Sequence, residues 1–196
     1  MSHHIYTTEG IVLGGISVGE SNRYVYILTK NLGLVGAHVQ GARELRSKLR
    51  FALDNFSHTE IAMVRGKDMW RVTSAIPLPS YQALFFDRDK LRTFARTASL
   101  VRRLVAGETE HAELFDFIFR MALFLASEKL TAKELACVEA LSALSVLDAL
   151  GYGEKNPAWR SFVGLPSLDR ELLKAFEPHC GNVTASVSRS LRESHL

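Results

Sequence analysis

Cysteine is scarce in this chain, and its scarcity excludes two kinds of stabilising chemistry. Only Cys137 and Cys180 occur among the 196 residues, too few for a disulfide framework or for a zinc site of four thiolates. Cys137 lies between Ala136 and Val138 in a helical pattern, so we expect it to pack as a small hydrophobic side chain. We therefore expect no metal and no cofactor, and a reducing, intracellular compartment.

Long hydrophobic runs are also missing. The longest apolar stretch, residues 114–126, is interrupted by Asp116 and Arg120 and is too short to span a bilayer. The first nine residues lack the basic start and the apolar core of a signal peptide. These two absences indicate a cytoplasmic protein with no membrane partner.

Motifs of several enzyme classes are absent as well. Gly14-Gly15 is followed by neither a lysine nor a helical pattern, so it is no Walker-type phosphate loop. The chain has no His-Glu-x-x-His motif, no closely spaced strand carboxylates for catalytic magnesium, and no Gly-x-Ser-x-Gly nucleophile elbow. We therefore do not expect an enzyme, and a nuclease or an ATPase in particular is disfavoured.

The excess of positive charge is concentrated in the first part of the chain. The formal net charge is only +3, but residues 1–80 hold nine Lys and Arg against six Asp and Glu, whereas residues 81–196 hold fifteen of each. The densest group is residues 41–50, with four cations and one carboxylate. Such a segment lies at the surface and is suited to a polyanion such as a phosphate backbone.

Short β-rich runs predict about five strands before residue 80, with segment 41–50 as an excursion between the third and the fourth. Pro77 and Pro79 end this region, because proline cannot donate the hydrogen bond that a strand needs. This plan is typical of an OB-type barrel, but an SH3-like barrel would give nearly the same pattern. The predicted strands are residues 10–16, 23–29, 34–40, 56–64 and 69–76.

After residue 80 the spacing of apolar residues becomes helical. Thr131 can cap a helix while Glu134 reaches back to complete a capping box, and Gly151 can end the same helix. We therefore expect a two-domain α+β fold, with a five-stranded barrel over residues 1–80 and an all-α domain over residues 81–196. The predicted helices are residues 91–105, 114–125, 131–150, 168–176 and 184–192.

Binding a flexible nucleic-acid strand requires a track of cations with aromatic rings beside it. Each neutralised phosphate releases counterions, and each stacked base adds about 1–3 kcal/mol. The simpler alternative is that the cations are solvated and the aromatic rings fill the core, with Trp70 closing the bottom of the barrel. The candidate DNA-binding residues are the cations Arg23, Arg43, Arg46, Lys48, Arg50, Arg65, Lys67 and Arg71 and the aromatic residues Tyr24, Tyr26 and Trp70.

Several short motifs follow one another in the first fifty residues: Gly10-Ile-Val-Leu13, Gly19-Glu20 leading to Arg23, Leu28-Thr29, Gly33, Gly41-Ala42-Arg43 and Ser47-Lys48-Leu49. Their order and spacing resemble the start of bacterial RecO recombination-mediator proteins. Residues 147–152, Leu-Asp-Ala-Leu-Gly-Tyr, are similar to the end of a helix in the same family. The resemblance covers most of the first eighty residues specifically and the helical remainder loosely.

This resemblance implies an OB domain, a helical domain and a role in DNA repair at the nucleoid. Proteins of that family bind single- and double-stranded DNA, anneal complementary strands, associate with RecR and help load RecA onto strands coated by single-stranded-DNA-binding protein. Their helical domain also binds the acidic, apolar C-terminal tail of that protein, which requires an apolar pocket and an arginine. Candidates for tail binding here are Arg102, Arg103, Phe115, Phe119 and Arg120, unless the phenylalanines are core and the arginines solvated.

Two departures from the family pattern bear on function. Many members carry a zinc module of four cysteines after the Leu-Gly-Tyr element. The corresponding segment here, residues 153–168, is short and contains no cysteine, which indicates that the module is deleted. Glu44 follows Arg43 where the family commonly continues with basic residues, which weakens the positive field of the loop. We favour a non-enzymatic DNA-binding mediator over an adaptor whose barrel binds a partner protein and not DNA.

Overall fold

The computed structural model describes residues 4–67, 69–105, 107–152, 156–164 and 167–193, and it divides into two compact units. The first unit contains residues 1–80 together with residues 106–115. The second contains residues 81–105 and 116–196.

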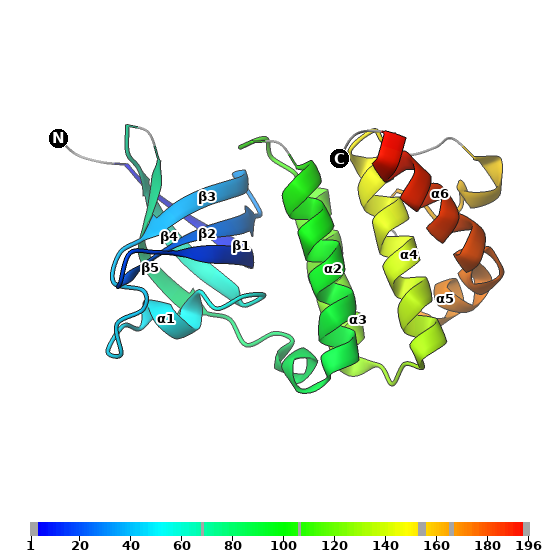
Figure 1. Cartoon of the computed structure of the whole chain (residues 1–196), viewed down its shortest axis with the longest axis horizontal. Coiled ribbons are helices and arrows are strands. Elements are labelled where there is room, and N and C mark those ends of the chain that lie inside the picture. Colours follow the sequence, from blue (N-terminus) through cyan, green and yellow to red (C-terminus); the bar gives the residue numbers. More distant parts are fainter. Residues whose placement is uncertain (1–3, 68, 106, 153–155, 165–166, 194–196) are drawn as a thin grey trace. The chain divides into compact units, whose positions relative to one another are not determined.

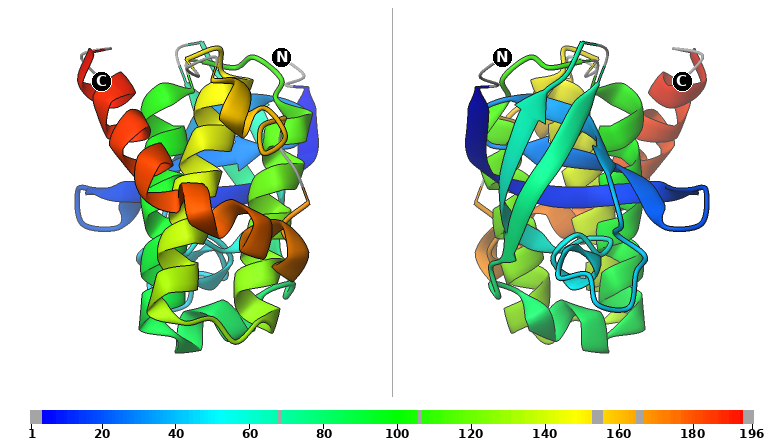
Figure 2. Two further views of the ribbon diagram at one scale, coloured as in Figure 1. Left: turned by 90° about the vertical axis from the view of Figure 1, so that its right-hand side faces the viewer. Right: turned by 90° about the vertical axis from the view of Figure 1, so that its left-hand side faces the viewer.

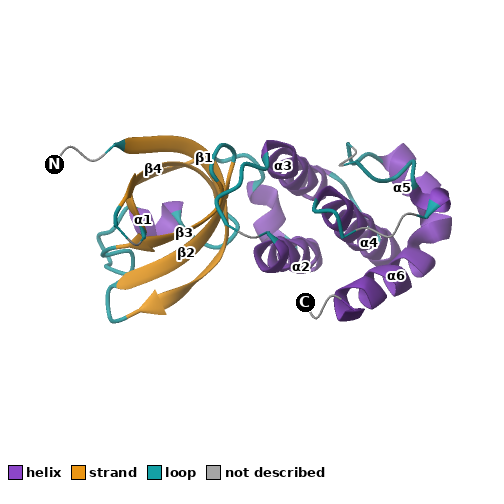
Figure 3. Ribbon diagram, turned by 90° about the horizontal axis from the view of Figure 1, so that it is seen from above, coloured by secondary structure: helices purple, strands orange, loops and turns teal. Residues whose placement is uncertain are grey.

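Five strands in the first unit close into a barrel (Figure 3). Their order around the barrel is β1-β2-β3-β5-β4, and β1 completes the ring because it pairs antiparallel with both β2 and β4. Only the β3–β5 pair is parallel. This arrangement confirms the predicted five-stranded OB-type barrel. The strands are β1 (Ile5–Val18), β2 (Asn22–Thr29), β3 (Gly33–Val39), β4 (His58–Arg65) and β5 (Trp70–Pro77).

Strand β1 is longer than the predicted segment 10–16, and a bend lets it serve two neighbours. Its first half pairs with β4 and its second half with β2. The register shifts between Val12 and Gly14, and Gly14 has a φ of 135°, which only glycine adopts without strain. Figure 2 shows this strand crossing the barrel and continuing into the β1–β2 turn.

Alternating side chains fill the interior of the barrel. In β3, for example, Val35, Ala37 and Val39 are fully buried, whereas the residues between them are partly exposed. Val25 and Ile27 of β2 and Ile61 of β4 join the same core cluster. Period-two burial of this kind fixes which face of each strand points outward.

A short helix that the sequence did not predict, α1 (Leu49–Ala52), lies at one end of the barrel in the excursion between β3 and β4 (Figure 1). Leu49 packs against the barrel core, while Ala52 is buried and Leu53 joins the core cluster. The Arg23 guanidinium donates a hydrogen bond of 2.9 Å to the Leu53 carbonyl, which fastens the end of α1 to β2.

The second unit is helical, as predicted. Helix α4 is its centre, since α2 packs on one side of it and α5 and α6 pack on another (Figure 3). The Ser142 hydroxyl of α4 donates to the Met121 sulfur of α3 at 3.4 Å. Within the described residues no helix is both long and apolar enough to cross a membrane. The helices are α2 (Arg88–Leu104), α3 (Ala112–Ser127), α4 (Ala132–Ala149), α5 (Arg170–Phe176) and α6 (Cys180–Glu193), with 3₁₀ turns η1 (Gln82–Phe86), η2 (Pro157–Trp159) and η3 (Glu177–His179).

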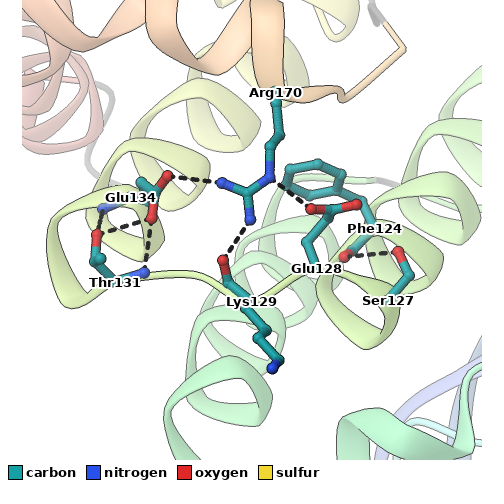
Figure 4. A network of polar contacts seen from close by, with 7 residues as sticks. All are labelled: Phe124, Ser127, Glu128, Lys129, Thr131, Glu134 and Arg170. Carbon is teal, nitrogen blue, oxygen red and sulfur yellow. Dashed lines mark hydrogen bonds and ion pairs between the residues drawn. The ribbon is translucent and has the colours of Figure 1, made fainter.

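The predicted capping box at the start of α4 is present. The Glu134 amide donates to the Thr131 hydroxyl, and the Glu134 carboxylate accepts from the Thr131 amide at 2.7 Å. The helix ends before Gly151, which has a φ of 78°. Arg170 fixes the connection from α3 to α4, because its guanidinium donates to Glu128, Glu134 and the Lys129 carbonyl (Figure 4).

The short stretch where relatives were expected to carry a zinc module, residues 153–168, is only partly described. Residues 153–155 and 165–166 lie outside the described residues. In the rest, Trp159 and Phe162 are buried, and the Phe162 ring lies edge-on to Phe176 of α5 at 5.3 Å. In the described part of the chain, no three His, Cys, Asp or Glu side chains are grouped so that they could hold a metal ion.

Candidate nucleic-acid interface

The basic loop, residues 41–50, is anchored at its start and exposed along its length. Gly41 has a φ of 63°, and its amide donates to the Asn22 side chain at 3.0 Å. The Arg43 amide donates to the Ser21 carbonyl at 2.9 Å. These two bonds tie the loop to the turn between β1 and β2, so its side chains project from a fixed backbone.

The four cations of the basic loop reach solvent. Arg43, Arg46, Lys48 and Arg50 are all exposed. Among the residues that the structure describes, Arg46 and Lys48 make no ion pair, and the Glu44 carboxylate lies beside Gly41. The single acidic residue of the loop therefore leaves these two cations to act on a ligand.

Three arginines converge on a polar hollow beside the loop, with a volume of about 370 Å³. Besides its hydrogen bond to the Leu53 carbonyl, the Arg23 guanidinium donates a hydrogen bond of 3.0 Å to the Asn55 side chain. It also forms an ion pair of 3.9 Å with Asp54. Arg43 donates one hydrogen bond of 3.1 Å to the Gly19 carbonyl. An arginine has five N–H donors, so each keeps further donors for an anion. The hollow is lined by Gly15, Ser17, Arg23, Ala42, Arg43, Arg50 and Asp54.

Tyr24 and Tyr26 lie on the outer face of β2, because the residues that alternate with them are buried. Their rings are half-buried and meet edge-on, with centroids 5.4 Å apart. Tyr24 lies opposite Ile16 of β1 and His38 of β3, and His38 lies opposite Arg71 of β5. These residues form an outward-facing row of mixed aromatic, apolar and cationic character.

The structure corrects the expectation that Trp70 is a stacking ring. Trp70 is only 4% exposed, and it belongs to the barrel core. Its indole Nε1 donates to Glu108 at 2.8 Å, and Tyr6 lies edge-on to it at 5.1 Å. Trp70 is therefore a core residue with little ring surface left for a base, as the alternative of a core tryptophan expected.

Arg65 and Lys67 lie at the other end of the barrel from the basic loop. Strand β5 runs parallel to β3 with Trp70 beside Ala37, so the turn before Trp70 lies toward the start of β3, whereas the basic loop follows its end. Arg65 is also engaged, by Glu108 at 3.4 Å and by the Trp70 ring at 5.6 Å. The predicted set of cations is thus divided between two ends of the barrel.

The residues predicted to bind a peptide tail lie on α2 and α3. Phe115 is 1% exposed and lies 6.3 Å from the His58 ring, so it cannot receive a peptide. Phe119 is partly buried and packs edge-on against Tyr81. Arg102 and Arg120 are exposed.

Arg103 lines a different feature, a groove of about 490 Å³ between α2, α4 and α6 that the sequence did not reveal. Leu100 of α2, Ala140 of α4, and Val187 and Leu191 of α6 supply apolar walls. Arg96 lies in the same groove and forms an ion pair with Glu139 at 2.8 Å.

Two exposed apolar side chains, one within the basic loop and one directly after it, were missed by the sequence analysis. Leu45 is 87% exposed and Phe51 is 70% exposed. The Arg50 guanidinium lies 5.9 Å from the centre of the Phe51 ring. A helix of four residues is too short to show a helical period, so the pattern of the sequence gave no signal that Phe51 points outward.

Comparison with known proteins agrees with this architecture. Residues 1–81 match the family model described as recombination protein O N terminal. Three proteins named DNA repair protein RecO illustrate the likeness. The one from Roseiflexus sp. is 32% identical over 152 residues, which are 78% of this chain and 52% of the relative. Those from Gloeothece citriformis and Heliobacterium modesticaldum are 35% and 30% identical over 113 and 148 residues, covering 58% and 76% of this chain and 40% and 52% of each relative.

The chain thus spans about half the length of the curated relatives it matches. The family model ends one residue after the first 80 residues, which build the barrel. The first 81 residues therefore belong to the family of RecO N-terminal domains, and the chain as a whole resembles the RecO proteins.

Proposed function

We propose that this chain acts in DNA repair as a non-enzymatic recombination mediator that binds DNA through its barrel. The observation that carries the proposal is the basic loop on an OB-type barrel, with two exposed cations, Arg46 and Lys48, that no carboxylate neutralises among the residues that the structure describes. The similarity to proteins named DNA repair protein RecO supports the same role. The substrates would be single- and double-stranded DNA.

Strand annealing follows from the same charges. Two complementary strands repel each other until base pairing begins, so cations that approach both phosphate backbones lower the barrier. Arg46 and Lys48 are suited to this because they are exposed and unpaired among the described residues. Base pairing itself then supplies the driving free energy, and the protein needs no nucleotide hydrolysis.

Partners are proposed on the same basis. We infer that the chain works with RecR and helps RecA to load on strands coated by single-stranded-DNA-binding protein. The groove between α2, α4 and α6 is better suited than Phe115 and Phe119 to an apolar, acidic tail, since its walls are apolar and Arg103 lies at its side.

An annealing assay with complementary oligonucleotides tests the proposal. Reversing Arg43, Arg46 and Lys48 to Glu should abolish annealing, because the loop would then repel both strands. A matched control reverses three exposed cations of the helical unit, Arg160, Lys174 and Arg189, and should anneal as the unchanged protein does.

Annealing that survives the loop reversal would exclude the loop as the DNA site. Little binding of single strands at any salt concentration would favour the adaptor, in which the barrel binds a partner protein. Turnover of nucleotide or DNA by the purified protein would contradict a non-enzymatic role.

A further inference from the structure

Phe51 occupies an unusual place in α1. The helix is fixed against the barrel, since Ala52 and Leu53 are buried and the Ser57 hydroxyl donates to the Ala52 carbonyl at 2.9 Å. Phe51 lies on the opposite side and leaves 70% of its side chain exposed. A single exposed apolar residue is common and means little alone, but this one is a large ring on an anchored backbone.

The surroundings of Phe51 are cationic. Arg50 precedes it in the helix, lies over its ring at 5.9 Å and also lines the polar hollow. Arg43 and Arg23 line the same hollow, and Asp54 is the one carboxylate among its described lining residues. Because Arg50 contributes to both features, the aromatic ring and the hollow are adjacent and share this residue.

We propose that the hollow and the Phe51 ring together form a subsite for one nucleotide of a single strand. A phosphate enters the hollow and accepts hydrogen bonds from Arg43 and Arg50, with the charge of Arg23 behind them. The base attached to this phosphate stacks on the Phe51 ring. The Arg50 guanidinium contacts the same ring through a cation–π interaction. This inference rests on the proposed DNA-binding function and adds a contact to the base.

The subsite selects single strands for a physical reason. In a duplex each base is already stacked between its neighbours, so a ring on the protein surface gains no base face. In a flexible strand the face is open, and the contact is indifferent to sequence because every base has a π-face. The cations of the basic loop would bind either form, whereas Phe51 would add affinity for the single strand alone.

The test distinguishes the contribution of the base to binding affinity from that of the phosphate. Affinity is measured for an oligothymidylate and for an abasic oligonucleotide with the same number of phosphates. Phe51→Ala should weaken binding of the oligothymidylate by about 5-fold to about 150-fold, the range expected for loss of one stacked base. It should leave binding of the abasic oligonucleotide unchanged, and Phe51→Trp should retain affinity for both.

Controls guard against indirect effects. Phe86→Ala removes another phenylalanine, 90% exposed in the helical unit, and should change neither affinity. In the Phe51→Trp variant, the new indole fluorescence should be quenched by the oligothymidylate and not by the abasic oligonucleotide. Each variant is compared with the unchanged protein by thermal unfolding, and Phe51 is exposed enough that the midpoints should agree.

The outcomes distinguish this inference from the function on which it rests. If the unchanged protein binds the oligothymidylate with the expected salt dependence and Phe51→Ala binds it equally well, the subsite is refuted and the DNA-binding role stands. Equal loss for both oligonucleotides also refutes stacking. If the unchanged protein binds neither oligonucleotide at low salt, the proposed function and the subsite both fail.

Discussion

The salt dependence of single-strand binding measures how many loop cations contact phosphates. The perturbation is neutralisation of Arg43, Arg46 and Lys48 to Gln, singly and together, which removes charge without introducing repulsion. Their side chains are exposed, so the substitutions should leave the fold intact. The measured quantity is the slope of the logarithm of affinity against the logarithm of salt concentration.

The magnitude follows from the four exposed cations of the loop. If each of Arg43, Arg46, Lys48 and Arg50 contacts one phosphate, their share of the slope is about −2.8, at about −0.7 per contact. Between 50 and 200 mM salt this share alone weakens binding about 50-fold. Each single neutralisation should make the slope shallower by about 0.7, and the triple variant by about 2.1.

Fluorescence anisotropy of a labelled oligothymidylate supplies the affinities at four or five salt concentrations. The matched control neutralises Arg160, Lys174 and Arg189 of the helical unit and should keep the original slope. A triple loop variant whose slope stays within about 0.7 of the unchanged protein would show that Arg43, Arg46 and Lys48 together contact at most one phosphate. That result would refute the reasoning from exposed charge to DNA contact.

Four further predictions concern stability and side-chain chemistry. Leu53→Ala should lower the free energy of unfolding by about 2–5 kcal/mol in a denaturant titration, because Leu53 is fully buried where α1 closes the barrel; a smaller loss would mean that α1 is not part of the core. Thr131→Ala should cost about 1 kcal/mol in the same assay, since it removes the hydroxyl that caps α4, and Thr131→Ser should restore it. Burial raises the pKa of the Cys137 thiol to about 12, so at pH 8 iodoacetamide should alkylate Cys137 about 1,000-fold more slowly than an ordinary thiol; mass spectrometry of the folded protein would detect early labelling that contradicts this. Burial lowers the pKa of His58, against the opposing effect of Glu9. As the pH falls, His58 therefore binds a proton at a higher pH in the unfolded chain than in the folded chain. Stability should therefore rise with pH from the lowered pKa of folded His58 up to about 6.5, and His58→Gln should flatten that rise, which unfolding curves at several pH values would reveal.

Local patterns predicted the parts of the fold that local physics decides. The alternation of Val35, Ala37 and Val39 with less buried neighbours gives β3, and Thr131 with Glu134 gives the start of α4. Both depend on residues within a few positions of each other. The barrel type was left open by the pattern, because pairing of β1 with β4 and of β3 with β5 joins residues far apart in sequence.

The candidate site was predicted only in part, for a related reason. The position of the basic loop follows from composition, but the hollow joins Ser17 of β1, Arg23 of β2 and Arg50 of α1. No short window contains all three. The same limit applies to Trp70. Alternation along the chain shows that its side chain points to the opposite face from those of Met69 and Arg71, but only the closure of the barrel decides that this face is the buried one.

Gly36 shows how one strand can govern a side chain of its neighbour. A Cβ atom at Gly36 would come within 2.2 Å of the Tyr24 hydroxyl oxygen. The phenol of Tyr24 therefore occupies the space that a side chain at this position would fill. Because that oxygen is the far end of a movable ring, alanine at this position would swing the phenol aside and leave the backbone pairing of β2 and β3 intact. The lack of a side chain at Gly36 of β3 therefore determines where the Tyr24 ring of β2 lies on the outer surface of the barrel.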